Sequence, residues 1–233
     1  MAQQDDNVRV EVISKEINQF DFNFKIIVIG NSGVGKSCLT LKATEDSFLP
    51  DYSSTIGFEF RSFYVKVEDT VIKLSIWDTC GQEIYRSLIR NFYRNSSLAI
   101  LVYSIDDENS FNDLDSWLNE IRTNGSPDMN IYLIGNKVDL EDQRVISKET
   151  AETFAQDNDI KLFLETSAKT GFNAQNLFIE VAKLLYNQHK SINDQNNRLN
   201  SLPDLIKLDN EEDNKNNNNN ENPDQEKRKK GCC

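Results

Sequence analysis

A glycine-rich stretch near the start of the chain, KIIVIGNSGVGKSCLT, has residue types that suit phosphate binding. From Gly30 to Ser37 it fits G-x-x-x-x-G-K-[ST], a loop whose backbone N–H groups surround phosphate oxygens. In that pattern Lys36 supplies a point charge to the β and γ phosphates, and the Ser37 hydroxyl ligates Mg²⁺. The alternative is an ordinary glycine turn, although chance places the pattern in only about one chain of this length in a hundred. The loop predicts a nucleotide site and leaves the base undecided.

A second motif, NKVD from Asn136 to Asp139, bears on the base. Guanine presents two donors, N1–H and N2–H₂, that one carboxylate such as Asp139 can accept together, whereas adenine has an acceptor at N1. A pocket built around that carboxylate rejects adenine, because buried polar groups would be left unpaired. Alone the motif is a weak signal, since Asp139 could simply cap a turn. The stretch ETSAK at residues 165–169 strengthens the prediction of a guanine site.

These motifs need strands to place them, and strand-like runs alternate with helix-like segments along the chain. The runs, rich in β-branched and aromatic residues, are 24–30, 58–67, 70–78, 98–106, 130–137 and 160–167. Only Glu68 and Asp69 separate the second run from the third, which predicts a hairpin. We therefore expect an α/β fold of the P-loop NTPase type: a six-stranded, mostly parallel sheet with one antiparallel strand and helices on both faces. Such sheets bind ligands at the carboxyl ends of their strands.

The composition excludes several classes of protein. The net charge of -12 and the pI near 4.6 argue against binding nucleic acid through a broadly basic surface. No run approaches the roughly 18 apolar residues of a membrane span, and the first twenty residues lack the pattern of a secretory signal. A single histidine leaves little for a hydrolase that needs a histidine base.

At this point the sequence resembles the Ras superfamily of small GTPases and, within it, the Rab family. The resemblance covers about residues 22–190, with the boxes GNSGVGKS, STIG, WDTCGQE, NKVD and ETSAK. Motifs that resemble those of the Rab family occur in IGFEFR, KLSIWDT, NFYRNS and the terminal CC. It implies a small GTPase domain over 22–190, between a flexible N-terminal extension (1–21) and a disordered tail (191–233) that is Asn-rich and charged.

The resemblance also assigns roles around the base and the phosphates. Asn136 would contact the base, the stem of Lys137 would lie across it, and Ala168 would offer its N–H to O6. Phe48 would flank the base from the other side, although it could instead be plain core. The implied GTP-binding set is Ser32, Gly33, Val34, Gly35, Lys36, Ser37, Cys38, Phe48, Thr55, Asp78, Gly81, Asn136, Lys137, Asp139, Ser167, Ala168 and Lys169.

The switch chemistry follows from the same resemblance. Mg²⁺ would be held by the hydroxyls of Ser37 and Thr55 and, through water, by Asp78. The Gly81 N–H would touch the γ-phosphate, and Gln82 would orient the attacking water as the catalytic residue. A missing arginine finger would make hydrolysis slow without a helper protein. Arg86 and Arg90 are local candidates for that charge, although a solvated helix face is the favoured interpretation of both.

Two residues depart from the family pattern. Cys80 stands where alanine is usual, and Ile84 stands where arginine is frequent. Cys80 is either a small buried apolar residue or a larger side chain that alters Gly81 and Gln82 and so changes hydrolysis. Ile84 should change which partners recognise the second switch.

Partner recognition is expected from an aromatic surface and from the tail. Ile56, Phe60, Trp77 and Phe92 would form the effector surface, although aromatic residues at strand ends are also common in cores. The terminal Cys232 and Cys233 resemble the Rab signal for two geranylgeranyl groups, and the basic run 227–230 would attract anionic lipid. The alternative is a solvated tail with inert thiols.

Together these features predict a Mg²⁺-dependent switch that binds GTP and GDP, hydrolyses GTP and regulates membrane traffic. The implied partners are an exchange factor, a GTPase-activating protein, a GDP-dissociation inhibitor, the prenylation machinery, effectors and an anionic membrane surface, with no nucleic acid. The protein would lie on the cytoplasmic face of a membrane and cycle with the cytosol. Alternatives are a Ras-like signalling GTPase, a GTP-loaded scaffold that Cys80 makes slow, and, more distantly, a nucleotide kinase, for which no second phosphate-acceptor site is evident.

Overall fold

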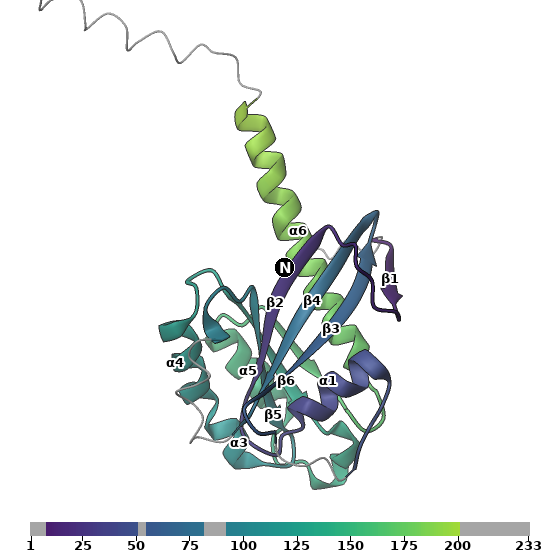
Figure 1. Cartoon of the computed structure of the whole chain (residues 1–233). Coiled ribbons are helices and arrows are strands. Elements are labelled where there is room, and N and C mark those ends of the chain that lie inside the picture. The colour runs from purple at the N-terminus through teal and green to yellow at the C-terminus, as the bar shows by residue number, and fades with distance from the viewer. Residues whose placement is uncertain (1–7, 51–54, 82–91, 201–233) are drawn as a thin grey trace, which may run out of the picture. The chain divides into compact units, whose positions relative to one another are not determined.

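The computed structural model describes residues 8–50, 55–81 and 92–200, with backbone alone for 193–200 (Figure 1). Within them, one sheet has the strand order β1-β3-β4-β2-β5-β6-β7. The strands are β1 (Val10–Ile13), β2 (Phe22–Ile29), β3 (Phe58–Val67), β4 (Thr70–Thr79), β5 (Leu98–Ser104), β6 (Asn130–Asn136) and β7 (Leu162–Glu165). The helices are α1 (Lys36–Glu45), α3 (Glu108–Asn112), α4 (Leu114–Asn124), the 3₁₀ helix η2 (Val138–Gln143), α5 (Lys148–Asp157) and α6 (Ala174–Asn200).

Strand direction confirms the predicted fold class. Strands β4, β2, β5, β6 and β7 pair in parallel, and β3 runs antiparallel to β4. Val67 pairs with Thr70, so Glu68 and Asp69 form the tight hairpin turn, with Glu68 at φ 54°. Because the parallel strands share one direction, their carboxyl ends meet at one edge of the sheet.

Strands β5 and β6 and the second half of β2 are buried on both faces, which explains their continuous apolar runs. In β2, Ile26 and Val28 belong to one core cluster, while Ile27 and Ile29 belong to the other. Helices α1 and α6 cover the first face, and α4 and α5 cover the second (Figure 1). Helix α6 packs through apolar residues at helical spacing, since Leu177, Phe178, Val181 and Leu185 are all buried.

The strand count corrects the expectation of six strands and of a flexible extension over residues 1–21. Residues 10–13 form β1, which pairs antiparallel with β3 from Val10 opposite Val67 to Ile13 opposite Tyr64. Val10 and Val12 pack against the first core cluster, whereas Glu11 between them is exposed. This alternation gives β1 an apolar side to bury, and that burial offsets the entropy of ordering a short segment.

The C-terminal helix also extends further than expected. The contacts divide the chain into a unit of residues 1–189 and a second unit from Lys190. We expect a disordered tail from residue 191, but α6 continues through Asn200. No glycine or proline interrupts residues 190–200, so the helix can propagate at one hydrogen bond per added residue. No helix among the described residues is long and apolar enough to cross a membrane.

The packing of β1 predicts a stability effect. Replacing Val10 and Val12 together by Ala should lower the free energy of unfolding by about 1–2 kcal/mol, because apolar area is lost from a half-buried site. Thermal unfolding should detect this as a melting temperature lower by roughly 3–6 °C. The matched control is Glu11→Ala on the exposed side of the same strand. Equal melting temperatures for both variants would contradict the role of β1 in the core.

Candidate nucleotide site

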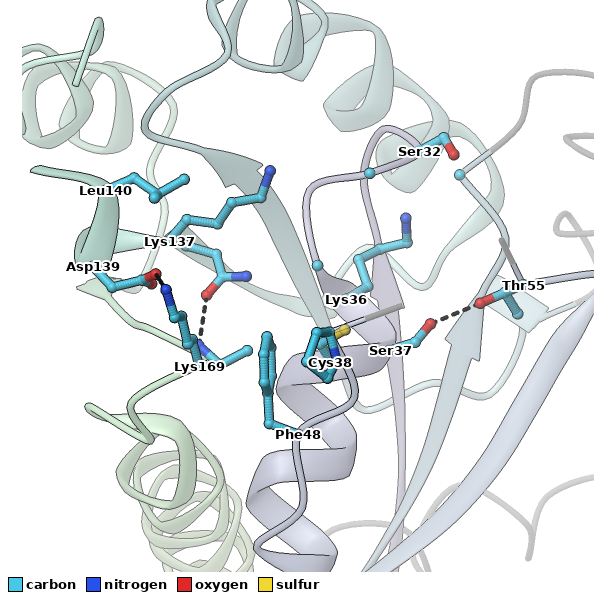
Figure 2. Close-up of a pocket in the computed structure, with 16 residues that line it drawn as sticks. Ser32, Lys36, Ser37, Cys38, Phe48, Thr55, Lys137, Asp139, Leu140 and Lys169 are labelled. Atoms are coloured by element: carbon cyan, nitrogen blue, oxygen red, sulfur yellow. Dashed lines mark hydrogen bonds and ion pairs between the residues drawn. The ribbon is translucent and has the colours of Figure 1, made fainter. Parts of the chain in front are cut away.

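A cavity of about 440 Å³ opens where the predicted phosphate and base motifs meet (Figure 2). Its walls come from the loop after β2, the start of α1, the segment between α1 and β3, the end of β6, and the segments that follow β4, β6 and β7. The lining residues are Ser32, Gly33, Gly35, Lys36, Ser37, Cys38, Phe48, Pro50, Thr55, Gly81, Asn136, Lys137, Asp139, Leu140, Ala168 and Lys169. The cavity therefore lies at the carboxyl edge of the parallel strands, as predicted.

The glycines of the loop take backbone conformations that other residues rarely adopt. Gly33 has φ 81° and Gly35 has φ 91°. A Cβ at Gly33 would meet nothing within 4 Å, whereas a Cβ at Gly35 would lie 2.5 Å from Asn136 Nδ2. Gly33 thus leaves room beside the cavity, and Gly35 allows close contact with the base motif. Helix α1 begins directly afterwards at Lys36, so its positive end adjoins the cavity.

Lys36 is a buried cation that backbone carbonyls hold in place. Its Nζ donates to the carbonyl oxygens of Gly30, at 2.9 Å, and Asn31, at 2.8 Å. Burial lowers the pKa of Lys36 to about 8, although the nearby Asp78 carboxylate opposes this shift. An ammonium has three N–H donors, so one donor remains for an anion in the cavity. A phosphate there would also favour the charged form of the lysine.

The three predicted metal ligands lie together at one side of the cavity. The Ser37 hydroxyl contacts Thr55 Oγ1 at 2.7 Å (Figure 2). It also donates to Asp78 Oδ2. Asp78 Oδ1 is buried and has no hydrogen-bond partner among the described residues, and burial raises the pKa of this carboxyl to about 6. A cation at this point would favour the carboxylate and compensate for its burial.

This donor set fits Mg²⁺. Among the described residues, no group of three or more His, Cys, Asp and Glu side chains could hold a metal. Mg²⁺ does not require such a cage, since it commonly takes one or two protein oxygens and completes its shell with phosphate oxygens and water. Ser37 and Thr55 could supply the oxygens, with Asp78 behind them.

At the base end, Asn136 joins three segments of the chain. Its Nδ2 donates to Val34 O at 2.9 Å, and its Oδ1 accepts from Thr166 Oγ1 at 3.0 Å and from Ala168 N at 3.3 Å. Both the donor and the acceptor of this buried amide are therefore used within the protein. Asn136 ties the phosphate loop to both base motifs.

Asp139 has its carboxylate oriented by neighbours from the ETSAK stretch. Oδ1 accepts from Ser167 Oγ at 2.6 Å, and Oδ2 lies 3.8 Å from Lys169 Nζ (Figure 2). Lys137 has φ 69°, and its Nζ lies 3.6 Å from Asp106 Oδ1. Phe48 lines the cavity and also packs at the edge of the first core cluster, so the two interpretations of Phe48 are compatible.

Most of the predicted site residues line the cavity, with some differences. Val34 is fully buried in the core, and its carbonyl oxygen accepts from Asn136. Ser167 and Asp78 do not line the cavity, but they bond to Asp139 and Ser37, which do. Pro50 and Leu140 line the cavity without having been predicted. Leu140 follows the NKVD motif directly and could have been found by that proximity. Gln82 lies outside the described residues.

A protein-family comparison agrees with this arrangement. A family model described as the Ras family matches residues 25–187, which is most of the chain. The chain belongs to the Ras family. As a Ras-family member it is a small GTPase switch, and such proteins bind GTP and GDP with Mg²⁺ and act with exchange factors, activating proteins and effectors.

The aromatic residues of this Ras-family chain form a continuous cluster beside the cavity. Trp77 lies with its ring centroid 5.2 Å from Phe60 and 5.1 Å from Phe92. Phe58, which is not among the residues that the resemblance implies, joins them at 5.2 Å from Trp77 and 4.6 Å from Phe92. Ile56 is 83% exposed, and Phe58 and Phe60 are each 48% exposed. The cluster thus has an apolar surface open to a partner.

Cys80 lies inside the second core cluster and is 2% exposed. This burial agrees with the interpretation of Cys80 as a small apolar residue. Its backbone N–H donates to Gly57 O at 2.9 Å, which links the segment after β4 to the segment before β3. Ile84 lies outside the described residues.

The two loop glycines predict different costs for the same substitution. Gly35→Ala should lose at least about 1 kcal/mol more stability than Gly33→Ala, because both require a strained positive φ but only the methyl group added at Gly35 would displace Asn136. Chemical denaturation of the two variants measures this difference. A Gly33→Ala protein that is as unstable as Gly35→Ala would contradict the contact with Asn136.

Proposed function

We propose that this Ras-family protein is a Rab-type GTPase that regulates membrane traffic from the cytoplasmic face of a membrane. The observation that carries the nucleotide assignment is that Lys36 and Asp139 line one cavity, with Asp139 at one side and Lys36 further across it, towards Thr55 (Figure 2). A cation suits phosphates, and a carboxylate suits the two donors of guanine. The geometry therefore supports GTP in one orientation, with its phosphates on the loop after β2.

In this proposal the residues of the cavity divide the work of holding GTP. Lys36 offers its remaining donor to the β and γ phosphates, and α1 adds its positive end. Ser37 and Thr55 would hold Mg²⁺ through their hydroxyls, and Asp78 would hold it through water. When bound, the ion would neutralise phosphate charge. Gly81 lines the same cavity, where its N–H would meet the γ-phosphate.

Hydrolysis then acts as the switch. Gln82 would orient the attacking water, and an activating protein would add charge stabilisation in the transition state. Once the γ-phosphate leaves, Thr55 and Gly81 both lose a partner, so the segments that carry them relax. A relaxed segment around Thr55 presents Ile56 and Phe58 differently to an effector.

The Rab assignment rests on the aromatic surface and on the tail. Phe60, Trp77 and Phe92 are the triad that the Rab resemblance implies, and they belong to one cluster. Cys232 and Cys233 would carry two geranylgeranyl groups, which anchor stably where one chain binds marginally. The basic run 227–230 would add attraction to anionic lipid. A GDP-dissociation inhibitor would then return the GDP form to the cytosol.

The base assignment predicts that the protein binds GTP and GDP in strong preference to ATP. Asp139→Asn should weaken GTP binding by about a hundredfold or more and reduce the preference over ATP, since the amide cannot accept both guanine donors. Competition of each nucleotide against labelled GDP measures both quantities. The matched control is Glu141→Gln, because Glu141 lies on the same 3₁₀ helix as Asp139, pairs with Arg144 and does not line the cavity. Equal affinity of the unmodified protein for ATP and GTP would refute the assignment.

The lipid anchor predicts a separation between location and nucleotide binding. Changing Cys232 and Cys233 to Ser should release the protein to the cytosol, because a hydroxyl cannot take a thioether-linked lipid and the basic run alone attracts membranes weakly. Changing one cysteine should weaken retention. Fractionation and GTP affinity should be measured on the same variants, and GTP affinity should not change. Unchanged membrane recovery of the double variant would refute the anchor.

A further inference from the structure

The phosphate loop is tied to helices α3 and α4 through the side chain of Asn31. Its Nδ2 donates to Asp113 Oδ2 at 2.6 Å, and its Oδ1 accepts from Trp117 Nε1 at 2.8 Å. An indole N–H can only donate, and a carboxylate can only accept, so these two partners fix which end of the amide is which. Only a side chain with one donor and one acceptor in this geometry satisfies both.

Both partners are suited to hold the loop in place. Trp117 is fully buried in the second core cluster, so its indole cannot move without disturbing the core. Asp113 occupies the N-cap position of α4 but makes no capping hydrogen bond with its side chain. Asp107, at the start of α3, does cap its helix, through Asn109 N and Ser110 N. The carboxylate of Asp113 is thus directed to Asn31 at the expense of its own helix.

The backbone of Asn31 contacts two residues that line the cavity, Lys36 and Gly81. Its carbonyl oxygen accepts from Lys36 Nζ at 2.8 Å. A Cβ added at Gly81 would collide with the Asn31 carbonyl and with Ser32 N, so the Gly81 backbone lies directly against this peptide. Any shift of Asn31 would therefore move a hydrogen-bond acceptor of Lys36 and the surface on which Gly81 rests.

We propose that Asn31 is a positioning residue: through Asp113 and Trp117 it fixes the loop carbonyl that holds Lys36, and it thereby sets how long the cavity retains its nucleotide. This inference rests on the proposed assignment of the cavity to GTP and GDP. It adds a determinant that lies outside the cavity, since neither Asp113 nor Trp117 lines it.

The inference is tested by exchanging the two polar partners. Asn31→Asp alone keeps an acceptor for Trp117 but places a carboxylate against that of Asp113, and it should speed GDP release by about tenfold or more. Adding Asp113→Asn restores the hydrogen bond with its direction reversed, because the new amide at position 113 donates to the new carboxylate at position 31. The double variant should release GDP within about threefold of the unmodified rate. Release is measured by chasing labelled GDP with excess unlabelled GDP in the presence of Mg²⁺.

Two controls separate positioning from net charge and from general stability. The first control combines Asn31→Asp with Asp115→Asn and has the same net charge as the exchanged pair. Asp115 is exposed and lies on α4 two residues after Asp113. This variant should release GDP as fast as Asn31→Asp alone. The Val10→Ala/Val12→Ala protein loses stability at the far edge of the sheet and should release GDP at the unmodified rate. Melting temperatures of all variants accompany the rates.

The outcomes distinguish the inference from the proposed function. An unmodified protein that fails to bind GDP would overturn both. If it binds GDP but Asn31→Asp releases it at the unmodified rate, only the inference falls. The inference would also fall if Asp115→Asn restored slow GDP release as completely as Asp113→Asn does. It would fall likewise if the exchanged pair released GDP as fast as Asn31→Asp alone. Neither outcome would affect the assignment of GTP binding.

Discussion

The buried ammonium of Lys36 is the constraint on which the rest of the site depends. A lysine that is 5% exposed loses hydration, and burial lowers its pKa to about 8. Its neighbour Asp78 has the opposite problem, since burial raises the pKa of that carboxyl to about 6. Each charge supports the other only in part, so the lysine still favours an anion and the carboxylate a cation. Phosphate with Mg²⁺ supplies both together, which couples metal binding to nucleotide binding.

Two asparagines hold the loop around this lysine from different sides. Asn136 reaches Val34 O from the end of β6, across 102 residues of sequence, and Asn31 reaches Asp113 across 82 residues. Each amide both donates and accepts, so each joins two partners that could not bond to one another. Val34 is the one apolar side chain that the loop buries in the core, so long-range hydrogen bonds add rigidity to the rest of the loop. The same glycines that admit phosphate therefore create the need for both amides.

Separation along the chain also determines which features could be predicted from the sequence. The longer strands were predictable because apolar runs such as Ile26–Ile29 are local, and the cavity residues were predictable because their motifs directly follow such runs. Strand β1 was not, since its four residues gain stability only by pairing with β3, more than fifty positions later. The partners of Asn31 and the contribution of Phe58 to the aromatic cluster likewise depend on tertiary packing, which no local pattern encodes.

The metal side of the cavity and the aromatic surface share short pieces of backbone. Thr55 immediately precedes exposed Ile56, and Asp78 immediately follows Trp77 on β4. Trp77 pairs with Ile27 of β2 on one side and Phe60 of β3 on the other, so it is held by the sheet, whereas Ile56 lies before β3 begins. The Cys80 N–H bond to Gly57 O connects the two segments at this boundary. A partner that touches both residues would therefore contact Trp77, which the sheet holds in place, and Ile56, whose neighbour Thr55 lines the cavity. Such a partner discriminates between nucleotide states in proportion to how differently it contacts the segment in each.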